Sequence, residues 1–378
     1  MSENAMNGLL LAKHFYFDCV RPIIAAEMPE LTDAHAAGLV GYGSDVMGND
    51  DELSRDHEWG PRLVLFLSES DYPHLANKLD RVLNESLPLT FAGFPTRFKP
   101  AEEFCGSLVM SACGDGSHHI AITTAQTFLK LTIGHNGLPD DDFQWLSIPE
   151  QRLLEFTRGE IFSDGVGEIT VLRERLSYFP TDVWKYRLAY TFESLGWELD
   201  LIALCAKRGE PLSEHLNAAA TVARIVKLTF LLNRKYCPGY AKWLHREFKK
   251  LPIAAGAIDG LLTGVFATRD TDSILANIGR SLALVYAQFR NSHGLPDLPR
   301  DLPGRLSRGT MMPDTQVIAR TIQDSIEGPL RQVRIHGAPY GAVDQWLTQE
   351  DILLSPDHMN ALVQIYFAQP SRKPDWTK

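Results

Sequence analysis

The chain has 378 residues, of which 44% are apolar and 22% are charged, and its formal net charge is −10. This length fits two domains, and the composition is typical of a soluble globular protein. The acidic balance argues against a general nucleic-acid-binding protein, which needs a basic face to displace counterions. No secretory signal and no apolar run of bilayer length is evident, so we expect a cytoplasmic protein without a membrane segment.

Helical and strand patterns alternate along the residues up to about 145. Residues 8–30 have helical periodicity with a kink or break at Pro22, and residues 71–84 have helical spacing again. Four short segments have the apolar content or the alternation of strands: residues 35–42, 59–68, 87–98 and 117–124. A further helix is expected to begin at Gln126. These patterns predict a mixed α/β domain.

Helical periodicity dominates after about residue 145. The segments that show it are 149–158, 182–205, 212–236, 240–250, 272–294 and the part from 315 onward. Residues 295–308 are rich in proline and are expected to form a connector. The predicted fold class is therefore α+β, with a mixed sheet and flanking helices in residues 1–145 and a larger, mostly helical domain in residues 146–378.

The cysteines show no spacing typical of a zinc site. There are five of them, an odd number, and no pair has the C-x-x-C pattern: Cys19, Cys105, Cys113, Cys205 and Cys237. We expect reduced thiols.

One segment, residues 40–67, carries a pattern that points to chemistry. A Gly-Ser pair, Gly43-Ser44, follows the first predicted strand, and after eleven residues Asp56-x-Glu58 precedes an apolar run. Gly43 has no Cβ, so its backbone can approach a triphosphate closely, and the Ser44 hydroxyl adds a donor. Successive amide groups in such a turn attract anions. We predict that Gly43 and Ser44 bind a nucleotide.

The two acidic residues are predicted to bind a metal. Asp56 and Glu58 lie two residues apart, so on a regular strand both carboxylates would point to the same face. Hard oxygen ligands beside a phosphate-binding turn suit Mg²⁺, which can stabilise the charge of phosphoryl transfer. Arg62 has the same parity on that strand. It is expected either to pair with a phosphate or to neutralise Asp56 or Glu58, and the sequence leaves these two readings open.

The order Gly-Ser, spacer, Asp-x-Glu resembles the signature of the DNA polymerase β-type nucleotidyltransferase superfamily. More narrowly, the segment GSDVMGNDDELSRDHEWGPRLVLFL is similar to an uncharacterised bacterial family described as nucleotidyltransferase-like, as are LLEFTRGEIFSDGVGEIT, LSYFPTDVWKYRLA and LLNRKYCPGYAKWL. The two-part layout is similar to that of aminoglycoside nucleotidyltransferases. The resemblance implies an α/β catalytic domain followed by a helical domain that shapes an acceptor pocket.

The chain departs from the superfamily pattern at one position. The superfamily has a third carboxylate on a later strand, where it polarises the acceptor hydroxyl, but Ala121 stands at the corresponding place between Ile120 and Ile122. His118 and His119 are candidate replacements for the missing base, but no metal-site spacing surrounds them, and a structural role at the edge of the strand is the preferred interpretation. Phosphoryl transfer depends mainly on positioning and charge stabilisation, so the loss of a base need not abolish activity.

The sequence therefore predicts transfer of a nucleoside monophosphate from an NTP, with ATP expected, to the hydroxyl of an acceptor, with Mg²⁺ and release of pyrophosphate. Asp56 and Glu58 would be the catalytic and metal-binding residues. The acidic chain favours a small-molecule acceptor over nucleic acid. Three alternatives remain: a nucleotide-binding protein without catalysis, a transferase that modifies a protein or an RNA, and a helical scaffold with a vestigial α/β part. The oligomeric state is not predicted.

Overall fold

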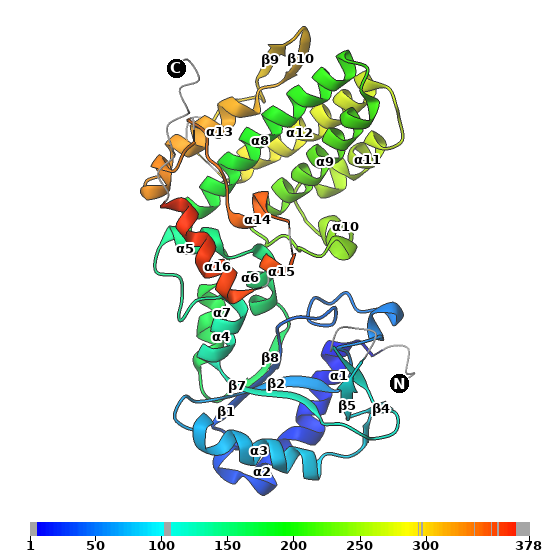
Figure 1. Ribbon diagram of the computed structural model, residues 1–378, viewed down its shortest axis with the longest axis vertical. Helices are drawn as coiled ribbons and strands as arrows, with labels where there is room; N and C mark the ends of the chain where they lie inside the picture. Colours follow the sequence, from blue (N-terminus) through cyan, green and yellow to red (C-terminus); the bar gives the residue numbers. More distant parts are fainter. Residues whose placement is uncertain are drawn as a thin grey trace, which may run out of the picture. The chain divides into compact units, whose positions relative to one another are not determined.

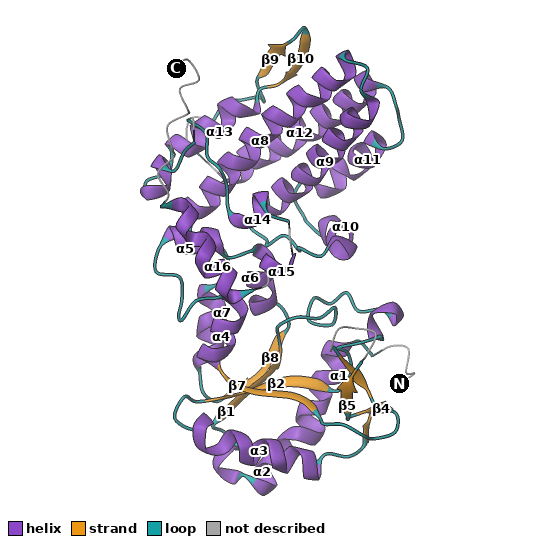
Figure 2. Cartoon of the chain, viewed as in Figure 1, coloured by secondary structure: helices purple, strands orange, loops and turns teal. Residues whose placement is uncertain are grey.

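A computed structural model describes residues 6–101, 107–293, 295, 298–335, 337–348, 350–353 and 355–367 (Figure 1). The chain forms two compact units. Unit 1 consists of Met1–Leu138 and Arg152–Ser177, and unit 2 consists of Pro139–Gln151 and Tyr178–Lys378. The sequence suggested one boundary near residue 145, whereas the chain passes between the units three times. The expected α+β fold class is confirmed, with a mixed sheet in unit 1 and mostly helices in unit 2 (Figure 2).

The N-terminal helix is interrupted just before its proline. Helix α1 (Gly8–Phe15) continues through a π-helical turn, Tyr16–Val20, into α2 (Arg21–Glu27). Pro22 lies in the first turn of α2. A proline there has no amide hydrogen to donate to the preceding turn, so the backbone widens upstream of it and the amide of Arg21 bonds to the carbonyl of Tyr16. The predicted break at Pro22 thus takes the form of a π turn.

The sheet of unit 1 has four strands in the order β7-β2-β1-β8. Strands β1 (His35–Leu39) and β2 (Arg62–Leu67) are antiparallel, and β7 (His119–Thr124) runs parallel to β2. The fourth strand, β8 (Glu160–Asp164), pairs antiparallel with β1. The sequence patterns predicted the first three strands and missed β8, which follows residues with strong helical periodicity.

Each face of this sheet is covered by helices. Leu63, Leu65 and Leu67 of β2 pack against α1, α2 and α3 (Tyr72–Ser86) in the main core of the unit. The alternate side chain Phe66 contacts Phe128 of α4 (Ala125–Ile133) on the opposite face. Because side chains of a strand alternate between faces, Arg62 shares the α4 face with Phe66. The burial of β2 on both sides explains its continuous apolar sequence.

The remaining strands of unit 1 form two small hairpins. The predicted strand 87–98 divides into β3 (Thr90–Phe91) and β4 (Phe94–Pro95), which pair across a tight turn. Strand β5 (Phe98–Pro100) pairs with β6 (Leu108–Met110). The turn at Ala92-Gly93 has positive φ at both residues, as a two-residue hairpin turn requires. Unit 1 also contains α7 (Glu168–Arg175) and most of α6 (Glu150–Thr157).

Unit 2 is built around long helices. Helices α8 (Thr181–Lys207), α9 (Pro211–Leu232) and α12 (Thr271–His293) match the predicted segments closely, and they pack against one another (Figure 1). The shorter helices of the unit are α5 (Asp142–Ser147), α10 (Ala241–Lys249), α11 (Ala255–Val265), α13 (Thr315–Asp324), α14 (Val343–Trp346), α15 (Glu350–Leu353) and α16 (Pro356–Leu362).

Helix α9 only just meets the length and hydropathy of a membrane span, and a core helix of a folded domain meets the same criteria. Helix α9 carries Arg224 and Lys227, and half of its most apolar window is buried inside the protein. Two charged side chains and an apolar window that is half buried are also typical of a core helix in a folded domain.

Two further predictions concerned the connector 295–308 and the cysteines. The proline-rich connector 295–308 ends in a hairpin of β9 (Gly304–Ser307) and β10 (Thr310–Pro313). Four cysteines are free thiols, as expected, and Cys105 lies outside the described residues.

Candidate functional site

The predicted nucleotide-binding turn lies in the loop between β1 and β2. Gly43 has a φ of +130°, a conformation that side-chain-bearing residues rarely adopt. A Cβ at this position would overlap Nη2 of Arg62 and Oδ1 of Asp45. The glycine is therefore required by the packing of this loop. A phosphate-binding role for its backbone stays a prediction.

Arg62 and Asp45 form a buried ion pair beneath this turn. Nη2 of Arg62 lies 2.6 Å from Oδ1 of Asp45, and Nε donates to Oδ2 at 3.0 Å. The same Nη2 donates to the carbonyl of Tyr42 at 2.9 Å. Arg62 thus neutralises Asp45. The partners that the sequence suggested for such a pair were Asp56 and Glu58. A bidentate contact of this kind commits most of the guanidinium, and nucleotide binding by Arg62 stays a prediction.

Ser44 begins a series of turns, not a helix. The carbonyl of Gly43 accepts from the amide of Met47 at 3.3 Å, and the carbonyl of Ser44 accepts from the amide of Asn49 at 2.8 Å. Ser44 is partly exposed, and its hydroxyl has no hydrogen-bond partner among the described residues. A free hydroxyl beside a glycine turn is compatible with the predicted contact to a phosphate.

The structure corrects the placement of Asp56 and Glu58. Strand β2 begins at Arg62, so both acids lie in the preceding loop and do not share a strand face. Glu58 has a φ of +50° and Gly60 has a φ of +136°, values that interrupt an extended strand. The sequence pattern could not show where the strand begins, because a Gly-Pro pair such as Gly60-Pro61 is compatible with the start of a strand and with a turn.

Glu58 is held by three donors from different elements. Its Oε2 accepts from Nε2 of His119 at 2.6 Å and from the hydroxyl of Tyr42 at 3.1 Å. Its Oε1 accepts from the amide of Leu108 at 2.8 Å. The Glu58 amide in turn donates to the carbonyl of Leu108 at 2.8 Å. Glu58 therefore fastens the loop to β6 and to β7.

This environment shifts the acidity of both Glu58 and Tyr42. Burial alone would raise the pKa of Glu58, but the hydrogen bonds from His119 and the Leu108 amide outweigh it and hold the pKa at about 2. Burial, together with the nearby Glu58 carboxylate, raises the pKa of Tyr42 to about 12. Glu58 is thus ionised and Tyr42 is neutral throughout the physiological range.

Asp56 is less constrained than Glu58. Its side chain is 46% exposed, and its Oδ1 accepts from the amide of His57 at 3.0 Å and lies 3.0 Å from Nδ1 of the same residue. Asp50, in the same acidic loop, anchors the N-terminus of α1, because its Oδ2 accepts from the amide of Gly8 and from Nε1 of Trp59. Among the described residues, Asp56 therefore makes polar contacts only to its neighbour in sequence, whereas Glu58 and Asp50 bind more distant elements.

The fit of Mg²⁺ to these residues is partial. The two carboxylates have the oxygen chemistry that Mg²⁺ prefers. Both oxygens of Glu58, however, already accept hydrogen bonds, and no cluster of three or more His, Cys, Asp or Glu side chains suited to a metal occurs among the described residues. The arrangement is not a preformed cation site.

Strand β7 brings His119, one of the two histidines considered as a replacement base, into contact with Glu58. His119 lies beside Arg62 in the parallel pairing of β7 with β2, and its side chain is 14% exposed. Ala121, two residues further, shares that face and is exposed, where the superfamily would have its third carboxylate. His118 points away and lies 3.3 Å from Asp80. The alternation of HIAITT could have distinguished the two histidines, but no pattern pointed to Tyr42 or Asp45.

Comparisons with known proteins give limited similarity. A family model described as a domain of unknown function (DUF4037) matches residues 145–244, about a quarter of the chain. Among solved structures, the chain is similar to a nucleotidyltransferase-like protein from Exiguobacterium sibiricum, with 10% identity and a TM-score of 0.32 over 78% of this chain and 99% of that one. A TM-score this low does not show a shared fold. No curated protein is significantly similar in sequence.

Proposed function

We propose that this chain is a nucleotidyltransferase. The acceptor hydroxyl oxygen attacks the α-phosphorus of an NTP, the bond from that phosphorus to the oxygen bridging to the β-phosphate breaks, and pyrophosphate leaves. ATP is the first nucleotide to test, and a small molecule is the preferred acceptor. The proposal rests on the Gly-Ser, spacer, Asp-x-Glu order and on the way the chain folds around it.

One observation carries the proposal. The loop between antiparallel β1 and β2 brings the residue before the Gly-Ser pair into contact with the Asp-x-Glu segment, across the spacer of eleven residues. Tyr42, directly before Gly43, donates to Glu58 at 3.1 Å. A turn with a free serine hydroxyl and an ionised carboxylate therefore lie at one place, as the binding of a triphosphate with a cation requires.

In this proposal Asp56 and Glu58 would hold Mg²⁺ together with the nucleotide, and the ion would supply charge stabilisation for the triphosphate. Asp56 is half exposed and accessible to a cation, whereas Glu58 would have to exchange a hydrogen bond for it. The remaining cation ligands would come from phosphate oxygens and water, because Mg²⁺ is commonly bound by one or two carboxylates plus substrate phosphates.

His119 is the proposed proton acceptor for the attacking hydroxyl. It lies on the same strand face as Ala121 and within hydrogen-bonding distance of Glu58. A histidine that donates to a carboxylate through one ring nitrogen presents the other nitrogen to a proton, which is a common arrangement for a general base. His119→Gln should therefore lower the rate of pyrophosphate release more than nucleotide affinity, and His118→Gln is the matched control on the other strand face.

The first test is calorimetric binding of a non-hydrolysable ATP analogue with and without Mg²⁺, followed by analogues of the other three NTPs. The wild type is compared with Asp56→Ala/Glu58→Ala. We expect Mg²⁺-dependent binding that the double variant loses. Glu85→Ala removes an exposed acid elsewhere in unit 1 and should leave binding unchanged.

Because Glu58 also fastens the loop to β6, the unfolding temperature of each variant must be measured alongside binding. Asp56→Ala alone separates the two effects, since Asp56 makes no comparable contact to another element. Absence of binding to all four analogues by the folded wild type would overturn the nucleotidyltransferase proposal.

A nucleotide-binding protein without catalysis is the second candidate. Two observations favour it: Ala121 occupies the place of the third carboxylate, and both oxygens of Glu58 are already hydrogen-bonded. Pyrophosphate release distinguishes the candidates. Release that depends on an added acceptor supports the transferase, whereas tight NTP binding with no release in any acceptor mixture supports the non-catalytic protein.

A further inference from the structure

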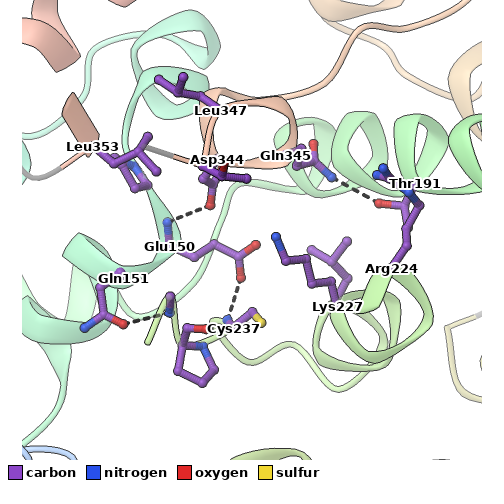
Figure 3. A pocket seen from close by; sticks show the side chains of 15 residues that line it. Glu150, Gln151, Thr191, Arg224, Lys227, Cys237, Asp344, Gln345, Leu347 and Leu353 are labelled. Atoms are coloured by element: carbon purple, nitrogen blue, oxygen red, sulfur yellow. Dashed lines mark hydrogen bonds between the residues drawn. The ribbon is translucent and has the colours of Figure 1, made fainter. Parts of the chain in front are cut away.

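Unit 2 contains a cavity of its own, of about 180 Å³. All of its lining residues belong to this unit, and they come from the start of α6, from α8 and α9, from the turn Cys237–Gly239, and from the segment around α14 and α15. Figure 3 shows Glu150 and Asp344 near one another, with Lys227 and Arg224 reaching in from α9. Charged side chains of both signs therefore meet at one hollow.

One side of the cavity is fixed by a buried ion cluster. Arg187 is fully buried, and its Nη2 lies 2.5 Å from Oε1 of Glu150 and 2.9 Å from Oδ1 of Asp344. The other oxygen of Glu150 accepts from the amide of Cys237 at 2.6 Å. Burial and the neighbouring Asp344 raise the pKa of Glu150, and the charge of Arg187 and the hydrogen bond from the Cys237 amide oppose that shift without cancelling it. With both carboxyl groups ionised, the cluster carries two negative charges and one positive charge.

Lys227 faces this cluster without an ion-pair partner. Its ammonium group extends toward Glu150 in Figure 3, yet among the described residues no carboxylate lies within ion-pairing distance of it. The neighbouring cation, Arg224, is neutralised by Glu198 at 2.7 Å. Lys227 therefore lies across the cavity from the cluster, and its charge offsets the excess negative charge without direct contact.

This charge pattern selects a kind of ligand. With Lys227 counted, the charges of the described side chains at the cavity balance, so a ligand with a net charge would leave one charge uncompensated in a poorly solvated site. A ligand with a negative group for Lys227 and a positive group for the partly exposed Asp344 leaves no such excess. The volume is smaller than the roughly 300–1,000 Å³ of pockets that hold drug-sized ligands, which indicates a small molecule.

We propose that the unit 2 cavity binds a free α-amino acid or a similarly small amino-carboxylate, with its carboxylate on the Lys227 ammonium and its ammonium group on Asp344. This proposal does not depend on the transferase activity proposed for unit 1. Thr191 and Gln345, which also line the cavity, are hydrogen-bonded to each other at 3.0 Å and form a polar wall.

The test is a binding screen on the full chain with three matched ligand sets: α-amino acids, the corresponding 2-oxo acids, which lack the ammonium group, and the corresponding amino-acid amides, which lack the carboxylate. Each set is examined by thermal shift and then by calorimetry. We expect binding of at least one amino acid and at least tenfold weaker binding of its 2-oxo acid and its amide, since each lacks one charge-assisted contact.

Lys227→Met removes the ammonium group and keeps the aliphatic stem. We expect it to weaken binding of the best amino acid by roughly tenfold or more, whereas Lys235→Met, which changes an exposed lysine of the same unit, should have no effect. Equal binding of the amino acid and its 2-oxo acid would overturn the zwitterion assignment. Failure of every amino acid to bind the folded wild type, or unchanged binding by Lys227→Met, would overturn the site itself.

Discussion

At the scale of single residues, Gly43 and Gly48 lie in the same loop and both have positive φ, but their surroundings differ. A Cβ on Gly43 would overlap the Arg62–Asp45 ion pair, whereas a Cβ on Gly48 meets nothing within 4 Å. Arg62 is buried in that pair, with 7% of its side chain exposed, and breaking such a pair is costly because it leaves an uncompensated charge. The loop therefore contains one glycine required by packing and one required only by conformation.

We predict that Gly43→Ala lowers the free energy of unfolding by about 3–5 kcal/mol, the cost typical of breaking a buried ion pair. Gly48→Ala should cost about 1–2 kcal/mol, which is the penalty for a side-chain-bearing residue in a left-handed conformation. Urea unfolding followed by circular dichroism measures both. Equal losses in the two variants would show that the Arg62–Asp45 pair does not depend on Gly43.

His35 is a buried histidine held in its neutral form. Its Nδ1 donates to the carbonyl of Leu31 at 2.6 Å, and its Nε2 accepts from the Tyr16 hydroxyl at 2.9 Å. Burial lowers the pKa of His35 below its usual 6.5, the hydrogen bond to the Leu31 carbonyl partly opposes this shift, and the nearby Arg21 adds to it. Protonation of Nε2 would remove the lone pair that accepts the hydrogen bond from the Tyr16 hydroxyl.

This shift predicts a loss of stability in mild acid. Well above pH 6.5 the imidazole is neutral in both the folded and unfolded states, so it contributes no pH dependence there. Below pH 6.5 the unfolded state takes up a proton before the folded state does, so stability falls as the pH decreases, by at most about 1.4 kcal/mol per pH unit. Urea unfolding between pH 7.5 and pH 5 measures this slope.

The matched variants are His35→Gln and His74→Gln, the second of which changes an exposed histidine of the same unit. His35→Gln should be less stable at every pH but should show a shallower decline in acid than the wild type. His74→Gln should keep the wild-type slope. An unchanged slope in His35→Gln would mean that other groups cause the acid sensitivity.

At the scale of elements, the sequence predicted helices better than short strands. The long helices α8, α9 and α12 were found because helical periodicity accumulates over many turns. Strand β8 has only five residues and follows helix α6 closely, and β9 and β10 have four residues each. Strands of that length carry little periodicity, and their pairing with distant partners decides whether they form.

The candidate site shows the same limit. The sequence located the loop and its acidic residues, because glycine, serine and paired acids in that order have a physical meaning at short range. It did not predict that Arg62 would pair with Asp45, or that Glu58 would contact His119, 61 residues away. Such contacts depend on the strand order β7-β2-β1, which periodicity alone does not specify.

At the scale of the whole molecule, the net charge of −10 bears on the choice of acceptor. A transferase that modifies RNA must first bind a polyanion, and that binding depends on lysine and arginine side chains free to contact phosphates. Two of the most buried cations among the described residues are already paired with acids: Arg62 with Asp45, and Arg187 with Glu150 and Asp344. Their charges are neutralised within the protein.

We therefore predict no binding of tRNA tighter than about 10⁻⁴ to 10⁻⁶ M at physiological salt, the range of non-specific nucleic-acid affinity, even when the NTP site is occupied. Fluorescence anisotropy of labelled tRNA at several salt concentrations measures this. A tighter complex whose affinity falls steeply with salt would show a basic face that the net charge conceals, and would make RNA the acceptor to test first. A weak complex, together with acceptor-dependent pyrophosphate release in small-molecule mixtures, would instead place the acceptor among small molecules, because nucleotide transfer to an RNA requires that RNA to bind first.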